Sequence, residues 1–493
     1  MRKFGYYLFA ALTTIILPTA CMEKLQVSPN PETVLSEPET YEKQISESML
    51  SLRNQLFPQT KSSNGGVSST ELIYASDLTV GTKSSAADDA PLICIVNFEG
   101  GGYSISGADP DYGIVYAVVE DGSLTASDFI QSYKAPGLTP LTLDAAEQIL
   151  GESPILPDGD SWFYDAGPDM IFKMIGSSAM KTNEAIQDSL TNPITVGGDD
   201  KYEITIGNDD GGLILKENNI LDVKYDYYYY LSSIISAVDD SEKLEWGQGT
   251  PFNDQCKLAY TGSDIRCPAG CVAIAVAQIL TYNGFPKDGD WDWNLLKQIK
   301  DSSEDDENLR DYVAEFVAFT GWDRNCNIRY RSDGSWAVAD GAKRTFRNFG
   351  YTNVSKSMYI HKFVDAAYAK VENMLKEGKP VFITAADGFE GHAWVFERVA
   401  DYLYVTEKTT IYKDGTEETE RIEAVNKSKL LYCNWGWDGS CNGYFSQICL
   451  NPDSIIVNYN EDGDEDDEYN NPEDSYMENG RFDWNYKLVT YDL

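Results

Sequence analysis

The stretch from Gly270 to Pro286, GCVAIAVAQILTYNGFP, constrains the fold more than any other part of the chain. Between Val272 and Leu280 its apolar residues recur at the i, i+3, i+4, i+7 spacing of one buried helix face. The Asn-Gly pair near its end and the proline after it are residues that stop helices. A glycine before the stretch permits a tight turn. We therefore expect a buried helix that begins at Cys271.

A cysteine at a helix start is a candidate nucleophile. In the first turn the backbone N–H groups lack intrahelical partners, and together with the helix dipole they favour a thiolate. Three alternatives remain open for Cys271. It could be a structural cysteine packed beside the alanines, it could form a disulfide with Cys267, or it could bind a metal together with Cys256 and Cys267.

A thiolate that performs acyl transfer needs a base, usually histidine, and the chain has only two histidines. His361 begins a segment with helical spacing that runs to Gly378, which favours a surface position. His392 lies between the buried-strand pattern of residues 379–385 and a second strand over residues 393–396. Because it starts a strand beside a turn, it is either a structural histidine or the base.

Two further segments carry side chains that suit this chemistry. The carbonyl of Asn434 could accept the second ring N–H of His392, and the indole of Trp435 could shield that bond, although tryptophans spaced by glycine could equally belong to a core. Gln248 lies 23 residues before Cys271. Its side-chain N–H could join the Cys271 backbone N–H as an oxyanion hole.

Four motifs occur in one order: WGQGTPFN from Trp246, GCVAIAVAQI from Gly270, GHAWV from Gly391 and NWGWDG from Asn434. Together they resemble the catalytic domain of the streptopain family of bacterial cysteine peptidases over residues 246–445. The resemblance implies a papain-like α+β fold. It also implies the site roles, with Cys271 as nucleophile, His392 as base, Gln248 as oxyanion donor, and Asn434 and Trp435 as orienting groups.

The N-terminal half carries a weaker resemblance. Residues 95–103, IVNFEGGGY, followed by Ser-Gly-Ala-Asp at 106–109, are similar to the propeptide of that family, which keeps the enzyme as a zymogen. The family more often has Ser-Ala-Asp-Asp, so Gly107 departs from its pattern. A second departure follows His392, where Phe396-Glu397-Arg398 replaces a common Asp-Gly pair.

The chain begins with a basic Met-Arg-Lys, an apolar stretch to Leu17 and small residues before Cys21, which is the pattern of a secretory signal. Cys21 resembles the acylated cysteine of bacterial lipoproteins, and the alternative is an ordinary signal peptide. We expect five regions, and export as a surface or outer lipoprotein or as a secreted protein. The regions are a signal peptide (1–21), a tether with one short helical stretch (22–65), a propeptide-like α+β domain (66–215), a linker and maturation region (216–243) and a papain-like peptidase domain (244–493).

Several local expectations complete this organisation. A hairpin should surround the glycines at 100–102, a strand should cover 113–119 and a helix 145–150. The aromatic run at 225–231 reads as helical, for core packing or as a ligand platform. The acidic run at 461–468 is either a solvated loop or a calcium site, although its spacing fails the EF-hand rule.

The net charge of the chain limits the kinds of partner that it can bind. With 39 Lys and Arg against 79 Asp and Glu, the formal charge is −40, which makes nucleic acid an unfavourable ligand. We expect protein or peptide substrates, the chain's own propeptide as an intramolecular inhibitor, membrane contact only through a lipid on Cys21, and neither cofactor nor metal. The expected function is a cysteine endopeptidase. The alternatives are a thiol acyltransferase of transglutaminase type, or a non-enzymatic surface binding protein on a decayed peptidase fold.

Overall fold

The computed structural model describes thirteen ranges of the chain, and all structural statements below concern these residues. They are 38–58, 65–78, 91–109, 113–134, 164–165, 169–191, 220–332, 334–359, 365–387, 390–423, 428–446, 449 and 485–493.

The described residues form helices and strands with the following bounds. The helices are α1 (Pro38–Leu56), α2 (Ala75–Leu78), α3 (Ala126–Lys134), α5 (Asp169–Thr191), the short 3₁₀ helix η2 (Asp240–Glu242), α7 (Cys271–Asn283), α8 (Trp293–Leu296), α9 (Glu307–Gly321), α10 (Ala339–Asn348) and α11 (Asp365–Lys376). The strands are β1 (Val67–Tyr74), β2 (Pro91–Phe98), β3 (Tyr103–Gly107), β4 (Val115–Val119), β5 (Tyr164–Asp165), β6 (Ile220–Ser236), β7 (Thr352–Tyr359), β8 (Val381–Asp387), β9 (Glu390–Tyr412), β10 (Glu417–Glu423), β11 (Ser428–Asn434), β12 (Gly443–Ser446) and β13 (Asn485–Asp492).

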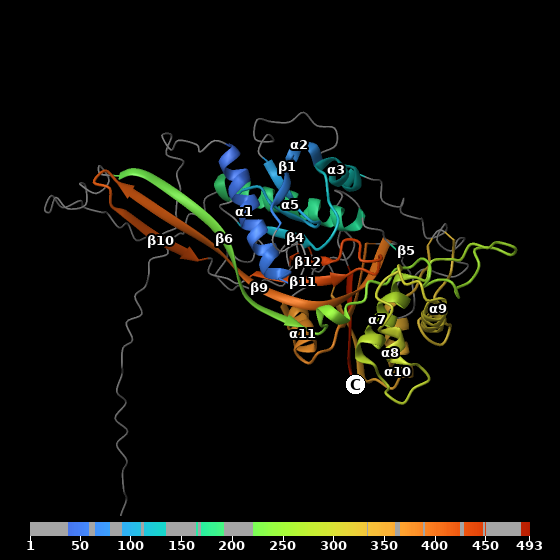
Figure 1. The fold of residues 1–493 in the computed structure, drawn as a ribbon. Helices are drawn as coiled ribbons and strands as arrows, with labels where there is room; N and C mark the ends of the chain where they lie inside the picture. The colour runs from blue at the N-terminus through green and yellow to red at the C-terminus, as the bar shows by residue number, and fades with distance from the viewer. Residues whose placement is uncertain are drawn as a thin grey trace, which may run out of the picture.

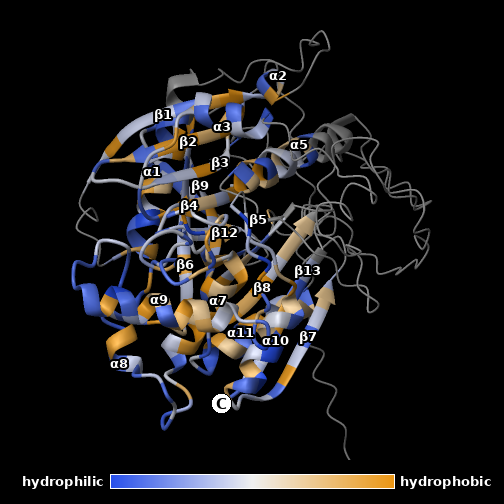
Figure 2. Cartoon of the chain, turned by 90° about the vertical axis from the view of Figure 1, so that its right-hand side faces the viewer, coloured by the Kyte–Doolittle hydropathy of each residue, from blue (hydrophilic) through white to orange (hydrophobic). Residues whose placement is uncertain are grey.

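One sheet contains all the described strands. Its order is β1-β2-β3-β4-β12-β11-β9-β8-β13-β7, and β5, β6 and β10 also pair with β9. Strands β1–β4 come from the N-terminal half and continue directly into the C-terminal strands, because β4 pairs antiparallel with β12. Figures 1 and 2 show the N-terminal strands and helices on one side of the molecule, with α7 to α10 gathered on the other. The two halves therefore share one sheet.

The central strands are buried on both faces. Along β2, Ile93 and Ile95 enter the larger hydrophobic cluster, whereas Cys94 and Val96 enter a smaller cluster on the opposite side. This alternation follows from the two-residue period of a strand. The larger cluster holds α7, and the smaller one holds the buried face of α1.

Strand β9 organises the C-terminal half. Its first part pairs with β8 and β11, and its second part pairs with β6 and β10. Beyond the main body, β6, β9 and β10 continue as a long three-stranded ribbon, which projects at the left of Figure 1. His392 lies at the opposite end of β9, near its first residue.

The expected α+β class is confirmed, because helices pack on a sheet that is antiparallel except for the pairing of β5 with β9. Local expectations are also confirmed. Helix α7 begins at Cys271, and Gly284 ends it in the left-handed conformation, with φ 55° and its N–H bonded to the Leu280 carbonyl. Strands β8 and β9 flank the turn before His392, β2 and β3 form the glycine hairpin, and β4 lies within the expected 113–119.

One expectation is wrong. The aromatic run at 225–231 is not helical, because it lies in β6, which pairs with β9 over 15 partner positions from Ile220 to Ser236. Tyrosine and isoleucine favour strands, and this preference prevails here. The helical stretch expected within 22–65 is present as α1, which covers 19 residues and buries Met49 and Leu52 completely.

Some expectations concern residues outside the described ranges. These are the signal region with Cys21, the helix at 145–150, the acidic run at 461–468 and the start of the His361 segment. Within the described ranges, no helix combines the length and the apolar character that crossing a membrane requires.

Candidate active site

Cys271 is the first residue of α7 and is 3% exposed. Gly270 precedes it with φ 92°, a left-handed conformation that favours glycine. The first backbone hydrogen bond of the helix runs from the Ile274 N–H to the Gly270 carbonyl over 3.1 Å. The N–H groups of residues 271–273 therefore lie at the unpaired helix start, where they favour a negatively charged sulfur.

His392 is fully buried, and its Nε2 lies 2.7 Å from the main-chain oxygen of Trp435. Because a carbonyl oxygen only accepts hydrogen bonds, Nε2 must carry the proton. In the neutral ring this leaves the lone pair on Nδ1, which is what a general base requires. The indole of Trp437 stacks on the imidazole with ring centroids 4.3 Å apart, which further restricts the orientation of the ring.

Two of the other motif segments contact the first turn of α7, and the segment with His392 packs against Trp435 and Trp437. The Gly436 backbone lies against Ile274, since a Cβ at Gly436 would stand 3.1 Å from the Ile274 Cγ2. The carbonyl of Gln248 accepts a hydrogen bond from the Ala269 N–H over 3.0 Å, two residues before Cys271. Segments far apart in the sequence thus surround the helix start that carries the candidate nucleophile.

The backbone of Gln248 lies near the start of α7, and its side chain is partly buried. Its Oε1 is buried and has no hydrogen-bond partner among the described residues. A side chain placed there for stability alone would satisfy that oxygen. The amide is therefore a candidate for binding a group that the protein itself does not supply.

Asn434 does not take the place that the motif suggested. Its Nδ2 donates to the Leu244 carbonyl at 2.6 Å and to the Glu397 Oε1 at 2.7 Å, and its Oδ1 accepts from the Gly436 N–H at 3.3 Å. The expectation that the Asn434 carbonyl binds the ring of His392 is therefore wrong. The next residue provides the acceptor, and does so with its main chain.

The sequence analysis did not predict Glu397, which is a hydrogen-bond partner of Asn434. Glu397 is fully buried, and its Oε1 accepts hydrogen bonds from the Asn434 Nδ2 and, at 2.8 Å, from the Tyr282 hydroxyl. Burial raises the pKa of Glu397, although Arg398, Asn434 and Tyr282 act in the opposite direction. The available signal was an acid inside the apolar run Ala393–Val399, at the position where this chain departs from the motif.

Cys94, Cys256 and Cys326 are also buried, but unlike Cys271 none of them lies at the start of a helix. Burial raises the pKa of Cys256 to about 11, and that of Cys94 and Cys326 to about 12. No disulfide joins any of the eight described cysteines, so Cys271 is not linked to Cys267 in this structure. Within the described ranges no group of three or more His, Cys, Asp or Glu is arranged to hold a metal ion, which leaves the metal alternative for Cys256, Cys267 and Cys271 without support.

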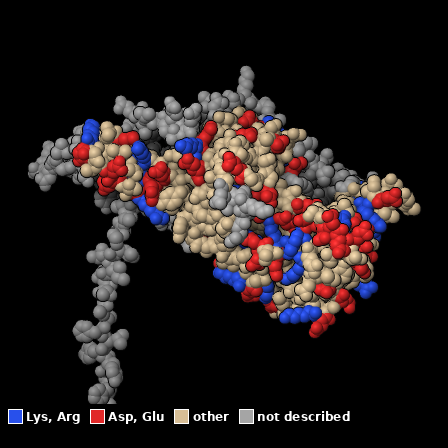
Figure 3. All heavy atoms as spheres, viewed as in Figure 1, with Lys and Arg blue, Asp and Glu red and all other residues tan. Residues whose placement is uncertain are grey.

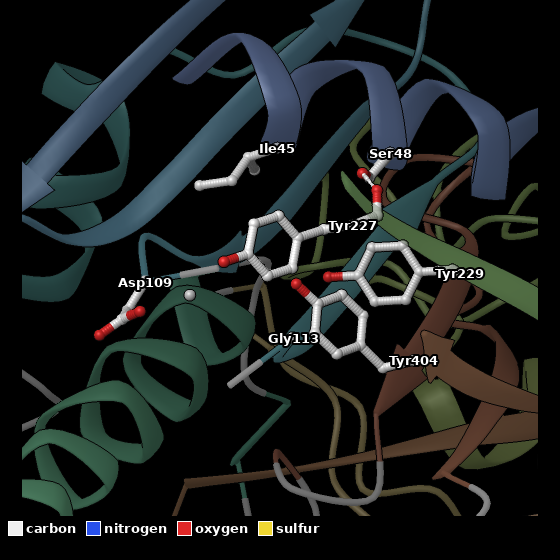
Figure 4. Close-up of a pocket in the computed structure, with 8 residues that line it drawn as sticks. Ile45, Ser48, Asp109, Gly113, Tyr227, Tyr229 and Tyr404 are labelled. Atoms are coloured by element: carbon white, nitrogen blue, oxygen red, sulfur yellow. Dashed lines mark hydrogen bonds between the residues drawn. The ribbon is translucent and has the colours of Figure 1, made fainter. Parts of the chain in front are cut away.

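A hollow elsewhere does not belong to this site. It is lined by residues of α1, β6 and β9 and by the chain between β3 and β4, and Figure 4 shows the rings of Tyr227, Tyr229 and Tyr404 grouped around it. None of its lining residues belongs to the four motif segments.

Carboxylates crowd part of the helical side in Figure 3, around α9, in keeping with the charge of −40.

Comparison with known proteins finds similarity over the four motif segments. Residues 246–291 and 287–445 match the sequence profile of the Peptidase C10 family. Streptopain of Streptococcus pyogenes is 22% identical over 280 residues, which cover 49% of this chain and 63% of streptopain. The thiol protease/hemagglutinin PrtT of Porphyromonas gingivalis is 26% identical over 246 residues, which cover 44% of this chain and 24% of that protein. The match thus spans less than two thirds of either relative.

Two solved structures from Prevotella intermedia are also similar. A prointerpain A fragment aligns with 86% of this chain and 98% of its own length at 15% identity, with a TM-score of 0.42. The active cysteine protease interpain A aligns with 52% of this chain and 93% of its own length at 19% identity, with a TM-score of 0.34.

Proposed function

We propose that this chain, whose residues 246–445 match the profile of the Peptidase C10 family, is a cysteine endopeptidase that is exported as a zymogen. The observation that carries the proposal is the hydrogen bond from His392 Nε2 to the Trp435 carbonyl. It leaves Nδ1 as the proton acceptor on a ring beside the segments that surround Cys271.

The acylation step uses these groups as follows. Nδ1 of His392 takes the thiol proton, and the sulfur of Cys271 attacks the carbonyl carbon of the peptide bond. The backbone N–H of Cys271 and the side-chain N–H of Gln248 bind the oxyanion of the tetrahedral intermediate. The imidazolium then gives its proton to the leaving amine, the C–N bond breaks, and an acyl thioester on Cys271 remains.

Deacylation repeats the sequence with water as the nucleophile. His392 takes a proton from the water, whose oxygen attacks the thioester carbonyl, and the returned proton regenerates the thiol as the acid product leaves. Trp435 contributes its carbonyl, which stabilises the imidazolium formed in both steps. Trp437 covers one face of that ring and limits access of other water.

The zymogen part of the proposal is supported by contacts of the N-terminal half. Tyr164 and Asp165 form a short parallel pairing with Glu390 and Gly391, the two residues immediately before His392. Strand β4 pairs with β12, close in sequence to the Trp435 segment. We propose that this half inhibits the site and leaves it after cleavage, and that Cys21 carries the lipid of an exported protein.

The test is labelling of the full chain with an epoxysuccinyl inhibitor, followed by peptide mass spectrometry and a casein-hydrolysis assay. The expected result is one adduct on Cys271, increased by limited proteolysis, and hydrolysis that the adduct abolishes. Cys326→Ala is the matched control, because Cys326 is a fully buried thiol outside the four motif segments. Absence of both the adduct and hydrolysis would favour the binding-protein alternative, and amide transfer without hydrolysis would favour an acyltransferase.

A further inference from the structure

We propose that Glu397 is a positioning residue for His392, which acts through the side chain of Asn434 and the main-chain carbonyl of Trp435. The inference rests on the proposed function, because the orientation of His392 matters most if the ring is a catalytic base. It concerns a residue at which this chain departs from the family motif, and it gives Asn434 an indirect role in place of the direct one first expected.

The first step of the argument is the acceptor of the His392 proton. The ring is held by a hydrogen bond from Nε2 to the Trp435 oxygen at 2.7 Å. A side-chain acceptor could turn with the ring, whereas a main-chain carbonyl moves only with its peptide plane. Whatever fixes the backbone at Trp435 therefore fixes the imidazole.

The second step is how that backbone is held. The Trp435 N–H donates to the Asn442 Oδ1 over 3.0 Å, which anchors the nitrogen of the residue. On the preceding residue, Asn434 donates to Glu397 at 2.7 Å and to the Leu244 carbonyl at 2.6 Å. The side chain of Asn434 thus binds Glu397, whereas the main-chain carbonyl of Trp435 binds His392.

The third step is the place of Glu397 in the fold. Its carboxylate joins β9, which carries His392, to Asn434 at the end of β11 and to Tyr282 on α7, the helix that begins at Cys271. One oxygen thus joins the elements that carry the base, its acceptor and the nucleophile. The other oxygen, Oε2, is buried without a partner among the described residues.

A buried, half-satisfied carboxylate is costly for folding. Stability alone does not account for it, because an apolar side chain at position 397 would avoid the orphaned oxygen. The alternative explanation is that Glu397 only ties the three elements together. The two explanations differ in one observable, which is the state of the His392 ring in a protein that remains folded.

Histidine-selective ring ¹⁵N NMR of the full chain measures that state directly. The chain has two histidines, and a His361→Gln variant leaves the His392 signals alone. In this background we expect a single Nε2–H tautomer with a slowly exchanging proton. Glu397→Ala should give mixed tautomers and lose the slow proton. Glu397→Gln should keep both, because its amide oxygen can still accept from Asn434 and Tyr282.

Asn434→Ala should reproduce the Glu397→Ala spectrum, and the double variant should add nothing, because both act along one path. Thr345→Ala is the matched control, since it removes another buried hydrogen-bonded side chain, on α10, with no contact to this network. It should lower the melting temperature without changing the ring signals. If Glu397→Ala does not fold, Tyr282→Phe removes one bond to the same oxygen and should increase the proton's exchange rate.

The kinetic counterpart is a fall in kcat of roughly 10- to 100-fold for Glu397→Ala at unchanged KM, the range expected for a misplaced catalytic group. A folded Glu397→Ala protein with the wild-type tautomer and proton exchange would overturn the proposal. That result is independent of the proposed function, which fails instead if the wild-type chain neither binds the inhibitor nor hydrolyses casein.

Discussion

Two buried regions of the molecule differ in the contacts that hold them together. One is the candidate site formed by the motif segments, and the other is the contact between the N-terminal and C-terminal halves. Around Trp435, buried polar side chains are joined by hydrogen bonds, among them those from Asn434 to Glu397 and Gln278. We call the second region the junction. It is the smaller hydrophobic cluster, in which α1, β2 and β4 contact β6, β9, β11 and β12, with the ion pair Lys243–Glu120 at its edge.

The two sides of the junction also differ from each other. The N-terminal side is largely aliphatic, whereas the C-terminal side includes Tyr229, Tyr402, Tyr432 and Tyr444. Helix α1 covers the edge of β6 with side chains, since Gln44 and Gln55 donate to β6 carbonyls at 2.8 and 3.1 Å. Tyrosine tolerates both burial and water, which suits a surface that must be covered and later uncovered. We therefore expect substitutions at the site to change activity, and substitutions at the junction to change stability.

The largest expected effect is that of Cys271→Ala. It should reduce casein hydrolysis by roughly 10⁶-fold, the scale found when a catalytic nucleophile is removed. The unfolding midpoint should hardly change, because one sulfur is lost at a helix start. Turnover near that of the wild type would show that the site lies elsewhere, and Cys326→Ala serves as the control for loss of a buried thiol.

Gln248→Ala comes next. It should lower kcat by roughly 10²- to 10³-fold, the usual loss of one oxyanion donor, with a small change in KM. Stability should hold or rise, because the variant removes a buried oxygen without a partner. Gln255→Ala, an exposed residue of the same loop, is the control. A variant with unchanged kcat would assign Gln248 to the structure of the loop.

The same contrast describes what the sequence could predict. Cys271 and His392 were placed correctly at a helix start and a strand start, because 3.6-residue periodicity and turn residues are local signals. The sequence could not predict whether the Asn434 side chain faces His392 or Glu397. Neighbouring residues of an extended chain face opposite ways, and the packing of β9 and α7 decides on which side Glu397 lies. The strand β6 was missed for a related reason, because its pairing is with residues about 170 positions later in the chain.

At the junction, Leu52→Ala should lower the free energy of unfolding by about 2–5 kcal/mol, the range for truncating a buried leucine. Leu52 is fully buried in α1, whereas Leu50 is only partly buried, so Leu50→Ala is the matched control with a smaller loss. Chemical denaturation gives both values. Labelling of Cys271 should not decrease. A Leu52→Ala protein with wild-type stability would mean that α1 contributes little to the junction.

The smallest expected effect concerns Glu120, which links the halves through Lys243 at 2.6 Å and the Tyr432 hydroxyl at 2.8 Å. Burial alone would raise the pKa of Glu120, but Lys243 and Tyr432 more than offset this and lower it below its ordinary 4.5. A lowered pKa means that the ion pair stabilises the folded state above pH 4.5. This contribution is lost as the pH falls through the pKa of the folded state.

Glu120→Gln should therefore cost about 1–2 kcal/mol of unfolding free energy at pH 7, and the difference from the wild type should shrink progressively below pH 4.5. Urea denaturation at a series of pH values measures it. The control is Glu47→Gln, because the Lys43–Glu47 pair is exposed at 73% and 66% and should contribute less than about 0.5 kcal/mol. A Glu120 difference that stays constant with pH would mean that side-chain packing, rather than charge, joins the halves at this point.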